Sequence, residues 1–384
     1  MNTVLRKIKS LMVYLFNLPL YWIASYIPKN ENIWIFGTRS GLNYTDNSKY
    51  LFEYVNKHHP EITAVWLTSR KNIYNMLRTK GYTCYYRYSL KAIWIGLKAG
   101  YSVFSNSNIS DNMLYLNNRS TKLIQLWHGA PIKKIFYDNH MWSKFEHSKL
   151  KKKIFPFLIE KYDLIIALSA EDQGNFKSAF KSKQVFITGY PRNDIIKKET
   201  NKKLTITYLP TFRGSYGSNI DLLSRFGFNS SLYDNWLKNN NATLNIQLHP
   251  DNMPDKTLLQ TIRDTCIVFL SNIDSSEIIN QTDILITDYS SVFFDFLLTD
   301  LPIIFAPFDH DNYIKKDREF YYDYSAITPG PKCNNWNDIL DWIELFKNDP
   351  SHYSIERKII KNRFHFYQDN NSCERVYNTV RHLK

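Results

Sequence analysis

The segment KLIQLWHGAPIKK, residues 122–134, joins an apolar run to a cluster of polar and basic side chains. Its first part, Lys122 to Trp127, has the length and apolar character of a buried β-strand. His128 and Gly129 follow directly, and Lys133 comes shortly after a proline. The segment therefore predicts a strand whose carboxyl end carries a histidine, a glycine and nearby cations.

Similar apolar runs recur along most of the chain and alternate with longer helical patterns. The runs are NIWIFGT (32–38), TAVWLT (63–68), YSVFS (101–105), YDLIIAL (162–168), LTITYLP (204–210), TLNIQL (243–248), CIVFL (266–270), DILIT (283–287) and PIIFA (302–306). Between them, residues 47–58 and 89–99 have helical patterns. This alternation is typical of βα units and of a parallel sheet. The predicted fold class is α/β.

The alternation occurs twice, on either side of the polar segment KKETNKK, residues 197–203. A chain of 384 residues, 43% of them hydrophobic, is long enough for two domains of ordinary size. We predict two doubly wound, Rossmann-like domains facing a central cleft, one over residues 31–196 and one over residues 203–384. Such domains bind ligands beyond the carboxyl ends of their strands.

Charge and cysteine content narrow the class of partner and compartment. Lysine and arginine outnumber aspartate and glutamate by 49 to 36, which gives a net charge of +13 and favours an anionic partner. The four cysteines form no CxxC pair, so neither a disulfide framework nor a zinc site is indicated, and a reducing cytosol fits best. The chain contains neither GxGxxG nor GxxxxGK[ST], which argues against a dinucleotide-binding site and against a P-loop nucleotide-binding site.

Residues 1–30 form a predicted membrane-associating segment. The apolar stretch from Leu11 to Ile27 contains Asn17 and Pro19, and it is shorter than the roughly 20 apolar residues of a membrane-spanning helix. An anchor lying in the membrane interface and a buried N-terminal helix are both open. A second segment, residues 143–159, places lysines beside apolar residues and favours an anionic membrane surface as partner.

Four short motifs have the same kind of location, because each comes directly after a predicted strand. They are WHGAP, PTFR, HP and DYSS. His128 can accept a proton near neutral pH, since the ordinary pKa of histidine is about 6.5, and Gly129 allows close approach of a substrate. Lys133 is a candidate to draw in an anion. The alternative for His128 is a histidine that only caps the end of a strand.

The motifs in the second half provide candidate phosphate ligands. Pro250 restricts His249 to an extended backbone at a strand exit, although an HP pair also occurs in surface turns. Ser290 or Ser291 is a good N-cap for a helix over the following apolar residues, and such a helix start suits a phosphate. Ordinary N-capping is the alternative. Asp288 precedes the serines in the same motif and is assigned to the same binding site.

Two arginines are candidate bidentate phosphate binders on loops. Arg213 lies in the PTFR motif together with Thr211, which we assign to the same site, and Arg318 lies in KDREFYYDY. Each could equally be a surface arginine. Asp288 and Asp295 could ligate a divalent ion, but they form no dedicated metal motif, and no protein-held metal is assigned.

Taken together, these motifs resemble the CDP-glycerol glycerophosphotransferase family, which includes teichoic-acid primases and polymerases and related capsule polymerases. The resemblance covers most of the chain beyond residue 30. It rests on IFGTRSGLNYTDNSKYLFEYV, LWHGAPIKK, GYPRND, YLPTFR, LHP, TDYSSVFFDF and DREFYYDYSAITPGP. It implies a GT-B fold with an N-terminal acceptor domain, a C-terminal nucleotide domain, and peripheral attachment to the cytoplasmic face of the cell membrane. It also implies that His128 is the catalytic base and that His249 works at the phosphates. Ala130 stands where many members have threonine.

The implied reaction moves a polyol phosphate from CDP-glycerol or CDP-ribitol to a hydroxyl of a lipid-linked or polymeric acceptor and releases CMP. Glycerol phosphate is the expected unit. No protein-bound cofactor is implied, and the Mg²⁺ dependence and oligomeric state are open. A GT-B glycosyltransferase that uses a nucleotide sugar is the first alternative. A non-catalytic nucleic-acid or membrane-binding protein is the second, but the chain has no recognisable nucleic-acid motif, so no nucleic-acid partner is predicted.

Overall fold

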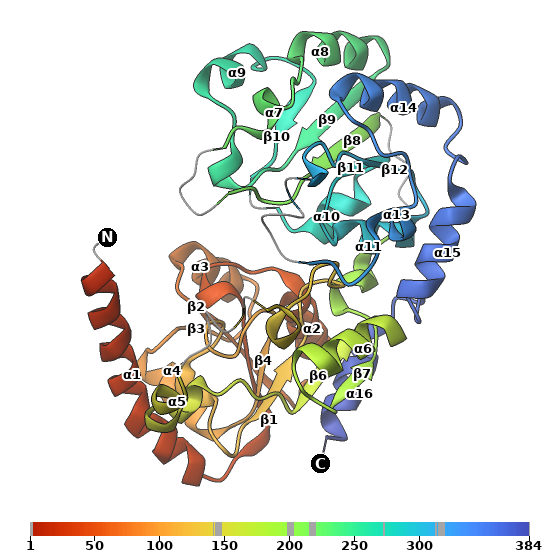
Figure 1. Ribbon diagram of the computed structural model, residues 1–384. Coiled ribbons are helices and arrows are strands. Elements are labelled where there is room, and N and C mark those ends of the chain that lie inside the picture. Colours follow the sequence, from red (N-terminus) through yellow and green to blue (C-terminus); the bar gives the residue numbers. More distant parts are fainter. Residues whose placement is uncertain are drawn as a thin grey trace. The chain divides into compact units, whose positions relative to one another are not determined.

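The computed structural model describes residues 3–140, 142, 148–197, 203–214, 220–271, 273–311, 313 and 319–383 (Figure 1). The chain forms two compact units. Unit 1 contains Met1–His128, Phe136–Asp194 and Asp369–Lys384, and unit 2 contains Gly129–Ile135 and Ile195–Gln368.

Unit 1 is built on a seven-stranded parallel sheet. Its strands are β1 (Asn30–Gly37), β2 (Thr63–Thr68), β3 (Cys84–Tyr86), β4 (Ala99–Phe104), β5 (Lys122–Gln125), β6 (Leu164–Ala167) and β7 (Val185–Ile187). Their order across the sheet is β3-β2-β1-β4-β5-β6-β7. The strand order reverses between β1 and β4. Doubly wound sheets bind ligands at such a switch point.

Helices surround this sheet and bury its apolar side chains. They are α1 (Thr3–Tyr26), α2 (Asp46–His58), α3 (Lys71–Thr79), α4 (Leu90–Lys98), α5 (Lys149–Ile154), α6 (Ala170–Ala179) and α16 (Ser372–Arg381). Ile35 and Val65 from the sheet pack with Ala92 of α4 and Tyr21 of α1 in one buried cluster. Strands buried on both faces explain why the sequence shows continuous apolar runs rather than alternation.

Unit 2 repeats the design with a five-stranded parallel sheet. The strands are β8 (Leu204–Leu209), β9 (Ala242–Ile246), β10 (Ile267–Phe269), β11 (Ile284–Thr287) and β12 (Ile303–Phe305), in the order β10-β9-β8-β11-β12. Its helices are α7 (Leu222–Arg225), α8 (Ser230–Asn239), α9 (Lys256–Thr261), α10 (Ser275–Asn280), α11 (Val292–Phe296), α13 (Tyr324–Ile327), α14 (Trp336–Asn348) and α15 (Ser354–Phe364). The winding reverses between β8 and β11, and Trp336 packs with Ile206 and Leu244 in the core.

The α/β class and the parallel sheets agree with the sequence prediction, and each predicted strand overlaps an observed one. The sequence analysis did not predict β3 and β7, the two edge strands of the unit 1 sheet.

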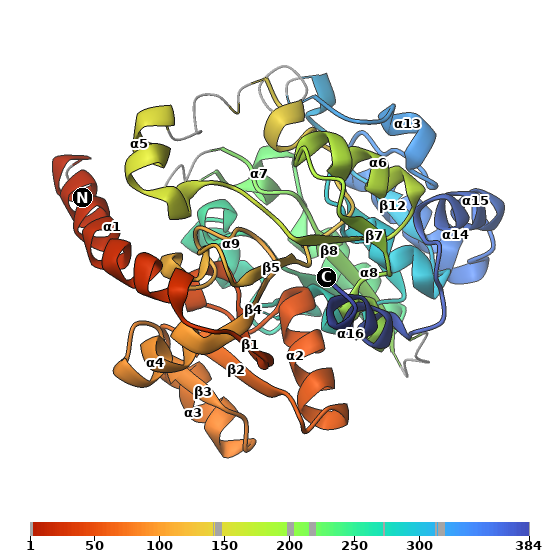
Figure 2. The same ribbon diagram turned by 90° about the horizontal axis from the view of Figure 1, so that it is seen from below.

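The units divide the chain differently from the predicted ranges 31–196 and 203–384, first at the C-terminus. Helix α16 belongs to unit 1, where it packs against α2 (Figure 2). The carboxylate of Asp194 accepts hydrogen bonds from the backbone N–H groups of Ser372 (2.8 Å) and Cys373 (2.7 Å). These bonds satisfy N–H groups at the start of α16 and fix that helix to unit 1.

The second difference lies within the WHGAPIKK motif. Residues 129–135 belong to unit 2, because their backbone pairs with the segment around Phe320. The N–H of Lys134 donates to the carbonyl of Glu319 (2.7 Å), and the N–H of Tyr321 donates to the carbonyl of Ile132 (2.8 Å). The chain therefore passes from unit 1 to unit 2 at the peptide bond between His128 and Gly129.

The predicted membrane-associating segment forms α1, a single helix that has one packed face and is part of unit 1. Asn17, Tyr21 and Ala24 are buried, and the side chain of Asn17 accepts a hydrogen bond from the N–H of Tyr115 (3.2 Å). The opposite face exposes large apolar side chains, among them Ile8, Met12, Leu15 and Phe16. Among the helices in the described part of the chain, none has the length and apolar character needed to cross a bilayer.

Candidate active site

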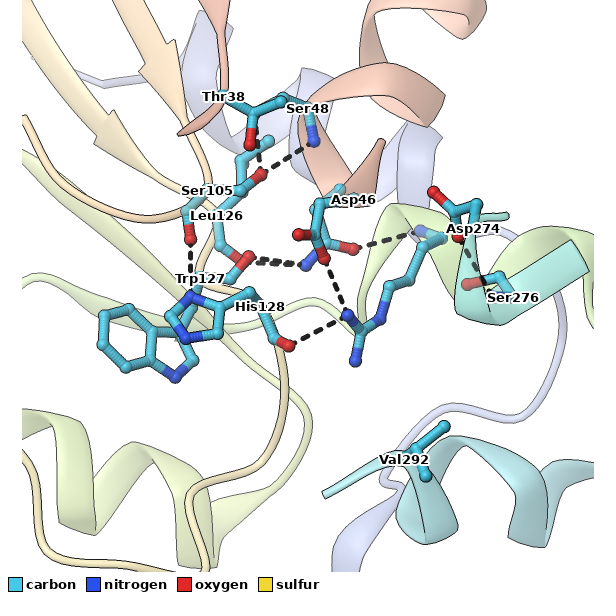
Figure 3. A network of polar contacts seen from close by, with 12 residues as sticks. Thr38, Asp46, Ser48, Ser105, Leu126, Trp127, His128, Asp274, Ser276 and Val292 are labelled. Atoms are coloured by element: carbon cyan, nitrogen blue, oxygen red, sulfur yellow. Dashed lines mark hydrogen bonds and ion pairs between the residues drawn. The ribbon is translucent and has the colours of Figure 1, made fainter. Parts of the chain in front are cut away.

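His128 lies directly beyond β5, beside the point where the winding of unit 1 reverses. Its Nδ1 is 2.9 Å from the carbonyl oxygen of Ser105, which follows β4 (Figure 3). A carbonyl oxygen only accepts, so Nδ1 carries the proton of the neutral ring and Nε2 keeps its lone pair. The fold therefore holds this imidazole in the tautomer that can take a proton at Nε2.

The surroundings of His128 keep the ring neutral at pH 7. Burial lowers its pKa below the ordinary value, the carboxylate of Asp46 and the bond to Ser105 raise it, and the cations of Arg39 and Arg192 lower it. The net shift is downward. A neutral imidazole is the form that a general base requires.

The backbone around His128 is held by residues to which the sequence analysis assigned no role. The side chain of Asn47, at the start of α2, donates to the carbonyl oxygens of Leu126 and Trp127, each at 3.0 Å. The buried guanidinium of Arg192 donates to the carbonyl of His128 (2.9 Å). Both residues lie in segments that carry the family resemblance, IFGTRSGLNYTDNSKYLFEYV and GYPRND.

The two other predicted residues of the same motif lie in unit 2. Gly129 has φ 145°, a backbone conformation that favours glycine. Steric constraint therefore explains why a glycine occupies this position. The Lys133 ammonium donates to the hydroxyl of Tyr313 and lies 4.8 Å from the centre of that ring. The contact with Tyr313 therefore helps to hold Gly129–Ile135 within unit 2, and Lys133 also adds positive charge there.

His249 lies beyond β9 with φ −64° and ψ 144°, the extended conformation predicted from Pro250. Its Nδ1 accepts a hydrogen bond from the N–H of Asp251 (3.2 Å), and its ring packs against Phe212. Since Nδ1 accepts, the proton of the neutral ring resides on Nε2. His249 therefore presents an N–H donor, whereas His128 presents a lone pair.

Arg213 is engaged inside unit 2 rather than exposed on a loop. Its Nε and Nη2 donate to the two carboxylate oxygens of Asp309 (2.8 and 3.0 Å), and Nη2 also donates to Asp288 (2.7 Å). Burial disfavours its charge, but these two carboxylates raise its pKa overall. The sequence predicted that the guanidinium of Arg213 binds an anion with two nitrogens, but the anion that it contacts is a carboxylate and not a phosphate. A role for Arg213 as phosphate ligand stays a prediction that these contacts do not support.

Asp288 and Thr211 belong to the same network. Asp288 is buried, and it accepts hydrogen bonds from Arg213 and from the N–H of Thr211 (2.8 Å). The hydroxyl of Thr211 is buried and has no hydrogen-bond partner among the described residues. Thr211 therefore keeps a free hydroxyl at the exit of β8, whereas Asp288 holds the loops after β8 and β11 together.

The helix after the DYSS motif is short. It is α11, followed by a 3-10 turn (Leu297–Thr299). Ser290 accepts a long hydrogen bond from the N–H of Val292 (3.4 Å), and Ser291 occupies the N-cap position without a side-chain hydrogen bond to the helix. The capping role therefore falls to Ser290, and both side chains are half-buried at the exit of β11.

His310, beyond β12, is a candidate that the sequence analysis missed. Its ring lies near those of Tyr289 and Tyr324, and its Nδ1 is buried with no partner in the described ranges. Its position two residues beyond PIIFAPF was the available signal. Arg318 lies outside the described residues. Within the part of the chain that the structure describes, no three His, Cys, Asp or Glu side chains are grouped so that they could hold a metal ion.

The chain is similar to known proteins over most of its length. The family model described as CDP-Glycerol:Poly(glycerophosphate) glycerophosphotransferase matches residues 20–382. A teichoic acid poly(glycerol phosphate) polymerase of Bacillus spizizenii is 30% identical over 369 residues, which are 90% of this chain and 91% of that protein. A teichoic acid glycerol-phosphate transferase of Staphylococcus aureus is 25% identical over 388 residues, with 93% and 95% covered.

Solved structures of the wall teichoic acid polymerase TagF share the fold. One has a TM-score of 0.74 at 22% identity and covers 98% of this chain and 96% of that chain. The match of the family model over nearly the whole sequence, together with the first relative, decides the family. The chain belongs to the CDP-Glycerol:Poly(glycerophosphate) glycerophosphotransferase family, and it is a transferase whose donor is a CDP-polyol.

Proposed function

We propose that the protein transfers glycerol phosphate from CDP-glycerol to an acceptor hydroxyl in teichoic-acid or capsule synthesis and releases CMP. The observation that carries the proposal is the pair of opposite tautomers. His128 offers a lone pair at Nε2, because its proton is on Nδ1 and that N–H donates to the carbonyl of Ser105. His249 offers an N–H at Nε2, because its Nδ1 accepts from the N–H of Asp251. One ring suits a base and the other suits a group that stabilises negative charge.

In the proposed reaction, Nε2 of His128 takes the proton of the acceptor hydroxyl as that oxygen attacks the glycerol-bearing phosphorus. A new oxygen–phosphorus bond forms, and the bond from that phosphorus to the oxygen of CMP breaks. A hydroxyl is a poor nucleophile at neutral pH, so removing its proton contributes roughly 10²–10⁴-fold to the rate. The neutral state of His128 at pH 7 supports this role.

The leaving CMP gains charge on its phosphate as the bond breaks. The Nε2–H of His249 and the hydroxyls of Thr211, Ser290 and Ser291 are the donors that we assign to the diphosphate, since all four follow strands of unit 2. Hydrogen-bond donors fixed before the reaction stabilise such charge without reorganisation. The proposal requires that units 1 and 2 face one another across a cleft, as in a GT-B arrangement.

Donor choice tests the proposal directly. The purified protein is incubated with CDP-glycerol, CDP-ribitol or a panel of nucleotide sugars, together with a lipid-linked acceptor, and the released nucleotide is measured. Release of CMP from CDP-glycerol, with transfer of labelled glycerol phosphate to the acceptor, is the expected result. Turnover of a nucleotide sugar alone would instead indicate a glycosyltransferase. Faster turnover of CDP-ribitol would change the donor but keep the reaction.

We also propose that the protein attaches peripherally to the cytoplasmic face of the cell membrane. The exposed apolar face of α1 supports this, because large side chains such as Met12 and Leu15 are 66% and 55% exposed. Basic residues lie close by: Lys151 of α5 is 4.8 Å from the ring of Tyr14 on α1. An apolar helix face beside lysines suits an anionic lipid surface.

A further inference from the structure

The first three residues of α2 hold both loops that position the catalytic base. Asn47 binds the carbonyl oxygens of Leu126 and Trp127. The N–H of Ser48 donates to the hydroxyl of Ser105 (2.9 Å), and the two serine hydroxyls are 2.7 Å apart. Ser105 in turn accepts from the ring of His128. The start of α2 therefore orients the imidazole through its backbone on one side and through its ring on the other.

Asp46 adds the charged part of this arrangement. Its Oδ1 accepts a hydrogen bond from Nη1 of Arg192 (2.8 Å), and the same nitrogen donates to the carbonyl of His128 (2.9 Å). The side chains of Asp46 and Arg192 are 9% and 5% exposed. In Figure 3, dashed lines join the carboxylate of Asp46 and the carbonyl oxygen of His128 to the same guanidinium. A buried guanidinium needs such a partner, because an uncompensated buried charge is costly.

The local backbone is also unusual. Asp46 has φ 65° and Trp127 has φ 54°, a region that side chains other than glycine seldom occupy. Such a backbone conformation is strained and persists only where the surrounding structure fixes it. The bonds of Asp46 and Asn47 to the segment around Trp127 and His128 provide that support.

We propose that Asp46 is a positioning residue for His128 and sets the proton affinity of its ring during transfer, an inference that rests on the proposed function. When Nε2 takes the acceptor proton, the ring becomes a cation in a partly buried site. The charged groups that act on it are Asp46 on α2, Arg192 in the turn Pro191–Ile195 and Arg39 in the turn Arg39–Gly41. Of these three, Asp46 alone is an anion, so it stabilises the imidazolium against two cations.

The proposal gives opposite signs for two substitutions. Asp46→Asn removes the stabilising anion, so the pKa of His128 falls, the acid limb of the pH profile moves to lower pH by about one unit, and kcat at the plateau falls about 10-fold or more because the base is weaker. Arg39→Ala removes a cation, so the acid limb moves to higher pH. The side chain of Arg39 is 56% exposed, and this variant should fold even if Asp46→Asn does not.

Titration of the His128 ring by NMR, in the protein without substrate, separates this inference from the proposed function. Relative to the wild-type protein, the expected pKa of His128 is lower in Asp46→Asn, higher in Arg39→Ala and nearly unchanged in Asp46→Glu. Asp163→Asn is the matched control, because that carboxylate accepts from the N–H of Leu123 on β5 and pairs with the ammonium of Lys161 at 3.5 Å. An unchanged pKa of His128 in both Asp46→Asn and Arg39→Ala would overturn the inference.

The kinetic arm uses CMP release from CDP-glycerol. If the wild-type protein releases no CMP, the proposed function fails, but the ring titration still reports on Asp46. If the wild-type protein turns over and Asp46→Asn loses kcat with no movement of its pH profile, Asp46 has only a structural role and the inference is wrong. Partial recovery of kcat in Asp46→Glu, with the acid limb returned toward its wild-type position, supports it.

Discussion

The carbonyl oxygen of Ser105 accepts a hydrogen bond from Nδ1 of His128 over 2.9 Å, and this one contact decides which ring nitrogen can act as a base. Ser105 follows β4 and His128 follows β5, so adjacent parallel strands bring them together. The contact comes from the main chain of Ser105, and therefore the choice of tautomer depends on the fold more than on the identity of the side chain at position 105.

His128→Ala is expected to lower kcat for CMP release by roughly 10²–10⁴-fold, because the acceptor hydroxyl loses its base. Burial lowers the pKa of His128, so wild-type activity should persist below pH 6.5 and fall only as pH drops through the depressed pKa. Kinetics between pH 5 and 8, with thermal unfolding as the folding control, check both points. Retained turnover in a folded His128→Ala protein would refute the assignment.

His249→Ala is expected to lower kcat by about 10²–10³-fold, the typical cost of removing one preorganised donor to developing charge. The side chain is 33% exposed, so the free energy of unfolding should change little. His249→Gln restores an N–H donor and should recover part of the rate. A rise in KM for CDP-glycerol with kcat unchanged would mean that His249 binds the ground state equally well and has no special role in the transition state.

Arg213→Ala should destabilise unit 2 by about 3–5 kcal/mol, because it leaves the carboxylates of Asp288 and Asp309 without their buried cation. Urea unfolding measures the loss. Arg225→Ala is the control, since Arg225 is exposed in the same unit. Unchanged stability together with a higher KM for the donor would restore the phosphate-binding role predicted from the sequence.

His365 should make the protein less stable in acid. Its Nε2 donates to the carbonyl of Phe294 (2.7 Å), and burial lowers its pKa to about 4. Because the folded state resists protonation, stability is highest above the unfolded pKa of about 6.5 and falls as pH drops toward 4, by up to about 3 kcal/mol. Urea unfolding at pH 7 and pH 4.5 tests this, with His365→Gln expected to flatten the pH dependence. The exposed His58, replaced by Gln, serves as control.

Replacing Ile8, Met12 and Leu15 of α1 together by Gln should weaken binding to vesicles of anionic phospholipid by at least about 10²-fold, since each apolar side chain withdrawn from water contributes on the order of 1 kcal/mol or more. Sedimentation with the vesicles measures the binding. The matched control changes Ile355 and Ile359 to Gln, because both are exposed on α15 of unit 2. Equal losses in the two variants would argue against α1 as the attachment surface.

The sequence was sufficient for the parallel α/β architecture because buried strands such as β2 and β6 are continuous apolar runs. It also placed His128 and His249 at strand exits, since each directly follows such a run. The tautomers of His128 and His249 could not be predicted from the sequence. Each depends on one backbone group, the carbonyl of Ser105 or the N–H of Asp251.

Long-range pairs account for most of what the sequence could not provide. Arg213 meets Asp309 across 96 positions, and Arg192 meets Asp46 across 146, so no local pattern links either pair. The PTFR motif contains Arg213, but only the fold shows that the partner of this arginine is a carboxylate. The assignment of α16 to unit 1 has the same origin, because it depends on Asp194 capping a helix that begins at Ser372.

The interleaved connectivity of the units restricts how the protein can be taken apart. A cut between residues 196 and 203 would leave the first fragment without α16 and the second without residues 129–135, so neither would contain a whole unit. Fragment complementation would have to exchange both pieces at once. A fusion or deletion at the carboxyl end would act on the unit that carries His128, even though the intervening sequence forms the other one.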